Sequence, residues 1–213
     1  MRVLASLTMM RLRDHDVSAD RVLRALRLLD ESCLELIEGQ YLDIRYEDRL
    51  DVAVADYLVM IGRKTASLMA CSLELGALLG TNDGEVIAAL RSFGRYLGLA
   101  FQIRDDILGI WGDQEKTGKP VGSDIRRKKK SLPIVYALEQ AGSQARAELV
   151  NIYGRETIDD KALDTVLSIL ASVQAKARAQ SMAEEFCARG LARIENLALT
   201  PWGRQNLEEV AHF

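Results

Sequence analysis

Helical periodicity, broken by only three prolines in 213 residues, constrains the fold of this chain more than any other feature. Apolar residues recur three and four positions apart along most of the sequence, which is the spacing of one face of an α-helix. Hydrophobic residues make up 48% and charged residues 28%, a balance typical of a globular protein with a sizeable core. The sequence therefore predicts an all-α protein, folded as a single helical domain over residues 1–213.

Capping and turn signals bound the predicted helices. Ser18 can cap the second of them, and Asn82, Asp83 and Gly84 form the clearest turn. Between residues 112 and 130 the periodicity lapses into glycine, proline and charge, which predicts a long loop of the kind that often carries function. The predicted helices cover residues 3–10, 18–49, 51–79, 85–111, 132–140, 145–153 and 161–197, with a short one after Pro201. No capping residue precedes the first helix, which fits either an absent upstream segment or a frayed terminus.

Composition argues against several classes of protein. The net charge of −3 gives no overall attraction to nucleic acid or to an anionic membrane, and no aromatic residue interleaves the basic run from Arg126 to Lys130. No apolar stretch approaches the roughly 18 residues that span a bilayer, and the apolar start is too short for a signal peptide. Cys33, Cys71 and Cys187 lack metal-ligand spacing. We expect a cytoplasmic protein with free thiols that neither spans a membrane nor binds nucleic acid.

One helical stretch, from Phe101 to Asp113, carries acidic residues on a single face. Gln102, Asp105 and Asp106 share that face because residues three and four apart are neighbours on a helix. Two adjacent carboxylates repel each other unless a cation lies beside them. Mg²⁺ suits such a pair, since it takes one or two carboxylates and completes its shell with waters and phosphate oxygens. From these residues alone, the alternative is a solvated acidic end of a helix.

Basic residues in the loop that follows favour a bound anion. Lys119 and the run from Arg126 to Lys130 stand close in sequence to the two aspartates. A diphosphate needs such side chains because Mg²⁺ alone does not neutralise it. The sequence therefore predicts a diphosphate site in which the metal and the lysines act together, with a solvated basic patch as the alternative.

Two further polar segments interrupt apolar helix faces upstream. Lys64 and Thr65 lie among apolar residues in the predicted helix 51–79, where a buried lysine needs an anionic partner. Gln40 and Asp43 share a face of the preceding helix, and Gly39 permits the close approach of another helix. Each segment taken alone is also compatible with a snorkelling lysine or a polar helix face.

Together, in this order, these segments resemble the trans-isoprenyl diphosphate synthases, also called polyprenyl synthetases. The segments that carry the resemblance are Gly39-Gln40 with Asp43, Lys64-Thr65, Phe101-Gln102 with Asp105-Asp106, Thr117 to Asp124, and Lys129 to Pro133. The resemblance implies an isoprenoid-synthase-type helical bundle around a deep cavity. It also implies an Mg²⁺-dependent enzyme that condenses isopentenyl diphosphate with an allylic diphosphate.

Family roles carry over residue by residue to the matching positions of this chain. The resemblance implies that Asp105 and Asp106 hold the metal. It implies catalytic roles for Lys64, Thr65 and Gln102. The residues that would bind substrate are Gln40, Asp43, Lys64, Gln102, Lys119 and Lys129.

The chain departs from the family pattern in two places. The family's first aspartate-rich motif is absent, so we expect a bundle that is incomplete at the N-terminus and covers the C-terminal two thirds of the family fold. We also expect this chain to be inactive by itself. The third aspartate of the second motif is Gly109 here, and Asp113, one turn further on, can partly substitute for it.

Three functional hypotheses remain open. The first is a prenyl diphosphate synthase that acts as a homodimer and makes a medium-chain product such as geranylgeranyl diphosphate. The second is a non-catalytic or regulatory subunit of a heteromeric prenyl synthase. The third is a class I terpene cyclase, against which the basic loop from Lys119 to Pro133 argues.

Overall fold

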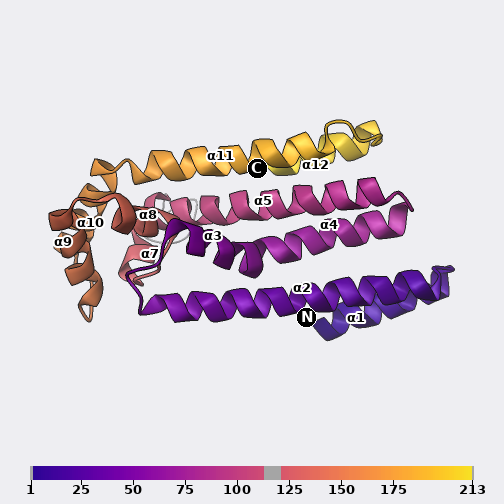
Figure 1. The fold of residues 1–213 in the computed structure, drawn as a ribbon, viewed down its shortest axis with the longest axis horizontal. Helices are drawn as coiled ribbons and strands as arrows, with labels where there is room; N and C mark the ends of the chain where they lie inside the picture. Colours follow the sequence, from indigo (N-terminus) through magenta and orange to yellow (C-terminus); the bar gives the residue numbers. More distant parts are fainter. Residues whose placement is uncertain (1, 113–120, 213) are drawn as a thin grey trace. The chain divides into compact units, whose positions relative to one another are not determined.

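The computed structural model describes residues 2–112 and 121–212. Every regular element in these ranges is a helix, which confirms the predicted all-α class (Figure 1). In chain order the elements are α1 (Arg2–Arg11), the 3₁₀ turn η1 (Leu12–His15), α2 (Ala19–Glu47), α3 (Val54–Ile61), the π-helical turn η2 (Gly62–Ala66), α4 (Ser67–Gly80), α5 (Gly84–Trp111), α7 (Ser123–Arg126), α8 (Leu132–Gln140), α9 (Ser143–Gly154), α10 (Asp160–Ser172), α11 (Ala175–Ile194) and α12 (Pro201–His212).

The chain divides into two compact units. The first contains Met1–Gln40, Ile61–Leu99 and Phe186–Phe213, and the second contains Tyr41–Met60 and Ala100–Glu185. Each unit buries its own apolar side chains. That the two form a single domain stays a prediction from the sequence.

In the first unit, two glycines let helix backbones come close together. A Cβ on Gly39 of α2 would lie 2.7 Å from the Cα of Lys64 in η2, and closer still to the Lys64 backbone nitrogen. A Cβ on Gly98 of α5 would lie 2.5 Å from the Cα of Ala66. No real Cβ tolerates such distances, so both positions require glycine. The close approach predicted at Gly39 is confirmed.

The predicted helix over residues 51–79 is wrong at its start and in its middle. It begins at Val54, because the Val54 amide donates to the carboxylate of Glu139 at 3.0 Å and the Ala53 amide donates to Asp56 at 3.3 Å. Glu139 is 85 positions away in the sequence, so no local signal marks this cap. The π-helical turn η2 then interrupts the helix. Such turns often occur at functional sites, and this one contains Lys64 and Thr65.

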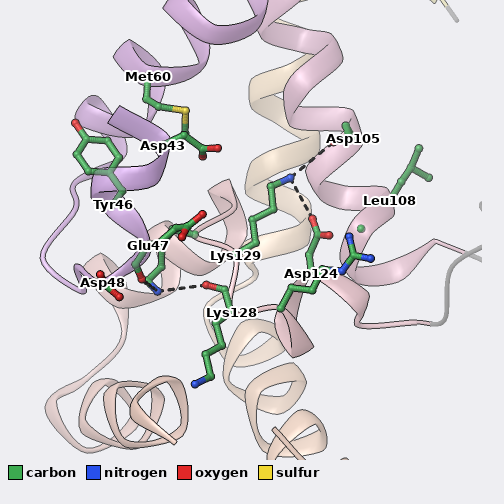
Figure 2. Close-up of a pocket in the computed structure, with 13 residues that line it drawn as sticks. Asp43, Tyr46, Glu47, Asp48, Met60, Asp105, Leu108, Asp124, Lys128 and Lys129 are labelled. Carbon is green, nitrogen blue, oxygen red and sulfur yellow. Dashed lines mark hydrogen bonds and ion pairs between the residues drawn. The ribbon is translucent and has the colours of Figure 1, made fainter. Parts of the chain in front are cut away.

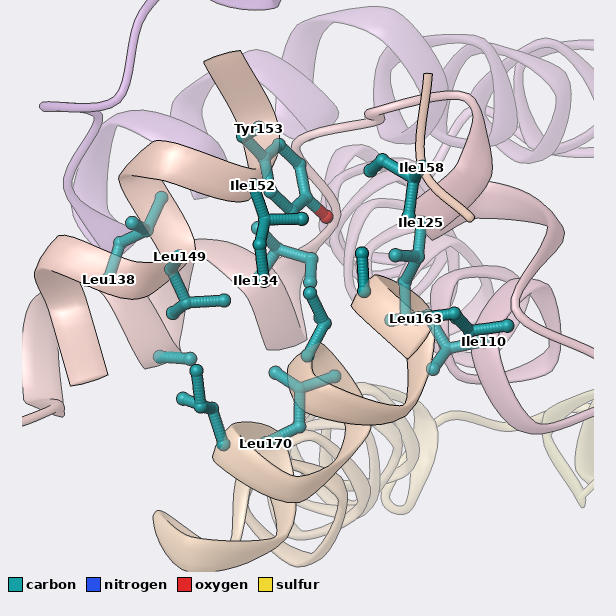
Figure 3. Packing of buried hydrophobic residues seen from close by; sticks show 14 of the residues in the cluster. Ile110, Ile125, Ile134, Leu138, Leu149, Ile152, Tyr153, Ile158, Leu163 and Leu170 are labelled. Atoms are coloured by element: carbon teal, nitrogen blue, oxygen red, sulfur yellow. The ribbon is translucent and has the colours of Figure 1, made fainter. Parts of the chain in front are cut away.

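The second unit is built on a cluster of buried aliphatic side chains from α5 and α7 to α10 (Figure 3). Ile125 of α7 is fully buried beside Ile110 and Leu163. The long loop predicted for residues 112–130 is therefore wrong at α7, where burial of Ile125 stabilises a helical turn. Gly122 precedes that turn at a φ of 75°, and a Cβ there would lie 2.6 Å from Leu163.

The structure also decides two further helix predictions. The helix predicted over residues 132–140 is confirmed, whereas the run over residues 161–197 is broken between α10 and α11. Gln174 lies in the break with a left-handed φ of 54°. Cys71 is a buried free thiol, as expected, whereas Cys33 and Cys187 are only half-buried. Among the helices that the structure describes, none is both long and apolar enough to cross a bilayer.

Replacing Gly39 by alanine tests the close approach of α2 to η2. Gly39→Ala should lower the free energy of unfolding by about 1–3 kcal/mol, because the added methyl forces two backbones apart. Gly76→Ala is the matched control, since nothing lies within 4 Å of a Cβ at Gly76 in α4. That variant should gain about 0.5–1 kcal/mol from the lower backbone entropy of the unfolded chain. Urea denaturation followed by circular dichroism measures both, and equal stability of Gly39→Ala and the unchanged chain would contradict the packing.

Candidate functional site

A cavity of about 760 Å³ opens in the second unit, bounded by the end of α2, the end of α5 and the segment from α7 to α8 (Figure 2). Charged side chains of both signs line it. The acidic ones are Asp43, Glu47, Asp48, Asp105 and Asp124, and the basic ones are Arg127, Lys128, Lys129 and Lys130. Carboxylates beside cations suit a ligand that combines a metal ion with an anion.

The carboxylate of Asp106 is completely buried at the base of this site. One oxygen accepts hydrogen bonds from the Tyr57 hydroxyl and, at 2.8 Å, from the Leu132 amide. The other accepts from Lys129 Nζ at 2.9 Å and from Gln102 Nε2 at 3.4 Å. Burial raises the pKa of the Asp106 carboxyl, and the charge of Lys129 opposes that rise. Four donors therefore occupy the oxygens that a metal ion would need.

Asp105, the next residue along α5, has a different environment. Its side chain is 53% exposed, and it lines the cavity. Successive residues point about 100° apart around a helix, so when Asp106 faces the protein interior, Asp105 faces outward. The amide of Gln102 donates to Asp105 at 3.2 Å and so contacts both aspartates. Asp105 is the member of the pair that a ligand in the cavity can reach.

Lys129 extends its ammonium group among three carboxylates, of which Figure 2 shows those of Asp105 and Asp124. Its Nζ lies 2.9 Å from Asp106, 3.2 Å from Asp124 and 3.7 Å from Asp105. Burial by itself would lower the pKa of Lys129, but the three carboxylates, Asp106 foremost, raise it above its ordinary value. Lys129 therefore stays charged, and a third of its side chain is exposed to the cavity.

The turn that presents Lys129 is held by backbone contacts. The amide of Lys129 donates to the carbonyl of Asp124 at 2.9 Å, and Lys128 adopts a left-handed φ of 56°. Lys130 Nζ donates to the Glu47 carbonyl at the end of α2 at 2.8 Å, where a cation also interacts favourably with the helix dipole. The site is thus shaped by chain geometry before any ligand binds.

The residues predicted from the sequence divide between the two units. Asp43, Asp105 and Lys129 belong to the second unit and line the cavity. Gln102 and Asp106 belong to the same unit and contact these lining residues through hydrogen bonds to Asp105 and from Lys129.

The other predicted site residues belong to the first unit or lie outside the described residues. Gln40, Lys64 and Thr65 belong to the first unit, where Gln40 is exposed on α2 and the other two are half-buried in η2. Lys119 and Asp113 lie outside the described residues. The roles assigned to all of these residues remain predictions.

Tyr57 and Asp124 belong to the site although the sequence analysis assigned neither of them a role. Tyr57 lies in an apolar run of α3, and its hydroxyl is recognisable only through its contact with Asp106. Asp124 follows Gly122 and Ser123 in the segment predicted as a loop. Asp124 also ends the segment from Thr117 to Asp124 that carries the family resemblance, and this is the sequence signal that could have singled it out.

The donor set accommodates Mg²⁺ only together with a ligand. Among the described residues, no group of three or more His, Cys, Asp or Glu side chains is arranged to hold a metal. Asp105 offers an accessible carboxylate, and Mg²⁺ commonly binds through one or two carboxylates plus waters and phosphate oxygens. The residues therefore fit a magnesium ion that arrives with a phosphate.

The sequence matches the family model described as polyprenyl synthetase over residues 2–170. The (2E,6E)-farnesyl diphosphate synthase of Mycobacterium tuberculosis (strain ATCC 25618 / H37Rv) is 39% identical over 201 residues, covering 93% of this chain and 56% of that relative. The resemblance inferred from the motifs is confirmed. The chain spans little more than half the length of this relative.

Two solved structures have the same fold. The crystal structure of polyprenyl synthetase from Streptomyces coelicolor A3(2) matches with a TM-score of 0.90 and 31% identity, covering 99% of this chain and 63% of that one. The geranylgeranyl pyrophosphate synthase from Corynebacterium glutamicum, complexed with isoprenyl diphosphate and magnesium, matches with a TM-score of 0.83 and 28% identity, covering 94% and 57%. The predicted isoprenoid-synthase-type helical fold is confirmed.

Removing one hydroxyl tests the hydrogen bonds that hold Asp106. Tyr57→Phe should lower the free energy of unfolding by about 1–3 kcal/mol, because a buried carboxylate loses a donor. Tyr153→Phe is the matched control, since the buried Tyr153 hydroxyl has no hydrogen-bond partner among the described residues. Its loss should leave stability unchanged or slightly higher. Equal effects of the two substitutions in a denaturant titration would show that the Tyr57 contact adds nothing.

Proposed function

The chain belongs to the polyprenyl synthetase family, and we propose that it carries the diphosphate-binding part of a prenyl diphosphate synthase site. The proposed reaction is the Mg²⁺-dependent condensation of isopentenyl diphosphate with an allylic diphosphate. The observation that carries this proposal is the cavity in which the charged Lys129 and the accessible Asp105 lie 3.7 Å apart. A carboxylate and an ammonium group at that distance suit a metal ion and a phosphate oxygen bound side by side.

The candidate site residues of the second unit have different proposed roles. Asp105 would hold Mg²⁺, and the metal would neutralise the negative charge on the departing diphosphate. Lys129 would donate to the phosphate oxygens. Asp106, which the sequence predicted as a second metal ligand, has four donors on its oxygens, and these support a role in positioning Lys129 and Gln102 instead. Asp43 lines the same cavity, which is consistent with its predicted role in substrate binding.

The remaining roles rest on the family resemblance. Lys64, Lys119 and Gln102 would contact the allylic diphosphate, and Gln40 would also bind substrate. Thr65 would stabilise the cation that develops as the diphosphate departs. The magnesium and isoprenyl diphosphate named for the Corynebacterium glutamicum structure support both the metal and the substrate class. A medium-chain product such as geranylgeranyl diphosphate is proposed because that protein is named a geranylgeranyl pyrophosphate synthase.

Exposed apolar residues on α2 support the homodimer that the sequence predicts. Leu34, Ile37, Tyr41 and Ile44 each leave more than half of their surface exposed and recur at helical spacing. A contiguous apolar stripe of this kind commonly marks a protein–protein interface. A glutamate in place of Ile37 would put a charge in the middle of the stripe.

The oligomeric state tests this interface. Ile37→Glu should sediment as a monomer at concentrations where the unchanged chain sediments as a dimer, because burying an unpaired carboxylate is costly. Val150→Glu is the control, since Val150 is also an exposed apolar residue but belongs to α9. A monomeric unchanged chain would contradict the homodimer.

Binding of inorganic pyrophosphate tests the diphosphate site directly. Calorimetry should detect binding in the presence of Mg²⁺ and none after chelation. Lys129→Gln should weaken that binding about 10- to 100-fold, the effect of losing one charge-assisted hydrogen bond. Lys161→Gln, an exposed lysine of α10, should bind as the unchanged chain does. Absence of Mg²⁺-dependent binding to the unchanged chain would refute the proposed site.

Turnover is a separate question from binding. With labelled isopentenyl diphosphate and an allylic diphosphate, we expect no elongation by this chain alone. Product formation by the purified chain would overturn that expectation and support a complete active site. A rate or a product length that differs between the full-length family member alone and its mixture with this chain would support the alternative, a subunit of a heteromeric prenyl synthase.

A further inference from the structure

Three consecutive lysines of the basic run contact different parts of the second unit. Lys129 extends its ammonium group among the carboxylates of the cavity. Lys128 Nζ donates to the Arg155 carbonyl, directly after α9, and Lys130 Nζ donates to the Glu47 carbonyl at 2.8 Å. The three side chains carry the same charge, so the structure and not the sequence distinguishes their surroundings.

The ammonium group of Lys130 contacts two backbone carbonyls and an aromatic ring. Besides the Glu47 carbonyl, Nζ donates to the carbonyl of Lys128 at 3.3 Å. It also lies 4.9 Å from the centre of the Tyr153 ring, a distance at which a cation is attracted to the ring face. Burial lowers the pKa of Lys130, and nearby carboxylates only partly oppose that effect. The contacts therefore hold an ammonium group that is partly removed from water.

These contacts join the turn to two helices of the unit. Glu47 is the last residue of α2, and Tyr153 of α9 is only 5% exposed within the cluster of buried side chains (Figure 3). Lys130 itself follows Lys129 directly and precedes Ser131, after which α8 begins. One side chain thus connects the segment between α7 and α8 to the end of α2 and to α9.

The turn needs such support because its backbone is irregular. Lys128 has a left-handed φ of 56°, which is unfavourable for a residue with a Cβ. Such a conformation persists where the surrounding contacts determine it. Lys130 Nζ donates to the carbonyl of this same residue and so closes the turn on the side of Lys129.

We propose that Lys130 and Tyr153 are positioning residues of the diphosphate site: the ammonium group of Lys130, held by the Tyr153 ring and the end of α2, fixes the turn from which Lys129 reaches the ligand. This inference rests on the proposed function. It gives Lys130 a role that acts through Lys129 and not through contact with the diphosphate.

The physical basis is the freedom of the turn. Without the contacts of Lys130, the backbone around Lys129 can adopt more conformations, and binding of a phosphate must then remove that freedom. The hydrogen bond from Lys129 to Asp106 remains, so the site is weakened and not abolished. The loss appears in ligand affinity.

Replacing Tyr153 tests the role of the ring without changing any charge. The measurement is the affinity for inorganic pyrophosphate in Mg²⁺, determined by calorimetry. Tyr153→Leu should weaken binding about threefold, the effect of losing one cation–π contact. Tyr153→Phe keeps the ring face and should bind as the unchanged chain does.

Replacing Lys130 tests the ammonium group in the same assay. Lys130→Met keeps the length of the side chain without its charge and should weaken binding about 10-fold. Lys130→Arg keeps a charged donor and should stay within about twofold of the unchanged chain. Lys176→Met is the matched control, because Lys176 also lies over an aromatic ring, 5.6 Å from the centre of Trp111, but belongs to α11. Its effect should stay below about twofold.

The same substitutions in a Lys129→Gln chain separate positioning from a general loss of fold. If Lys130 and Tyr153 act through Lys129, then Lys130→Met and Tyr153→Leu should each change the remaining affinity by less than about twofold in that chain. A damaged fold, or direct contact of Lys130 with the ligand, would weaken binding to the same extent whether or not Lys129 is present.

The outcomes separate this inference from the proposed function. Unchanged affinity in Lys130→Met, or equal losses in Tyr153→Phe and Tyr153→Leu, overturns the positioning role and leaves the diphosphate site intact. A loss in Lys176→Met as large as in Lys130→Met, or undiminished losses in the Lys129→Gln chain, also overturns it. If the unchanged chain does not bind pyrophosphate in Mg²⁺, the proposed function fails and this inference fails with it.

Discussion

The buried carboxylate of Asp106 is the interaction on which the candidate site depends. It accepts hydrogen bonds from Tyr57 on α3, Gln102 on α5, Lys129 in the following turn and the Leu132 amide at the start of α8. An unpaired buried charge costs several kcal/mol, so each of these donors offsets part of a large penalty. Four segments therefore contact the same carboxylate. Their polar groups are oriented before a ligand binds, as electrostatic stabilisation of developing charge requires.

The burial of Asp106 gives it a different environment from that of Asp105, its neighbour in the sequence. Asp105 and Asp106 have the same side chain and are adjacent, yet one lines the cavity and the other is fully buried. Asp124, from the separate α7 segment, lies against Gly109 and contacts the same lysine as Asp105 and Asp106 do.

Irregular backbone coincides with the segments that carry the proposed chemistry. Lys64 and Thr65 lie in a π-helical turn in the first unit, and Lys129 follows the left-handed Lys128 in the second. Departures from ideal helix geometry are costly unless surrounding contacts determine them, and they recur at functional sites for that reason. The two residues after Lys128 supply such contacts, since the Lys129 amide donates to the Asp124 carbonyl and Lys130 Nζ donates to the Glu47 carbonyl.

The sequence by itself determined the all-α class, the family, and most helix ranges, because these depend on periodicity, capping and short motifs. The helix from Leu132 to Gln140 was predicted correctly for this reason, since Pro133 at its first turn is a local signal. The start of α3 was not predicted correctly, because the Val54 amide is capped by a glutamate 85 residues away. Likewise, the spacing of Asp105 and Asp106 identified the acidic face, but only packing of α3 and α8 decided which of the two is buried. Only the tertiary structure showed that Tyr57 contacts Asp106 and that Asp124 contacts Lys129, because a side-chain contact leaves no periodic trace in the sequence.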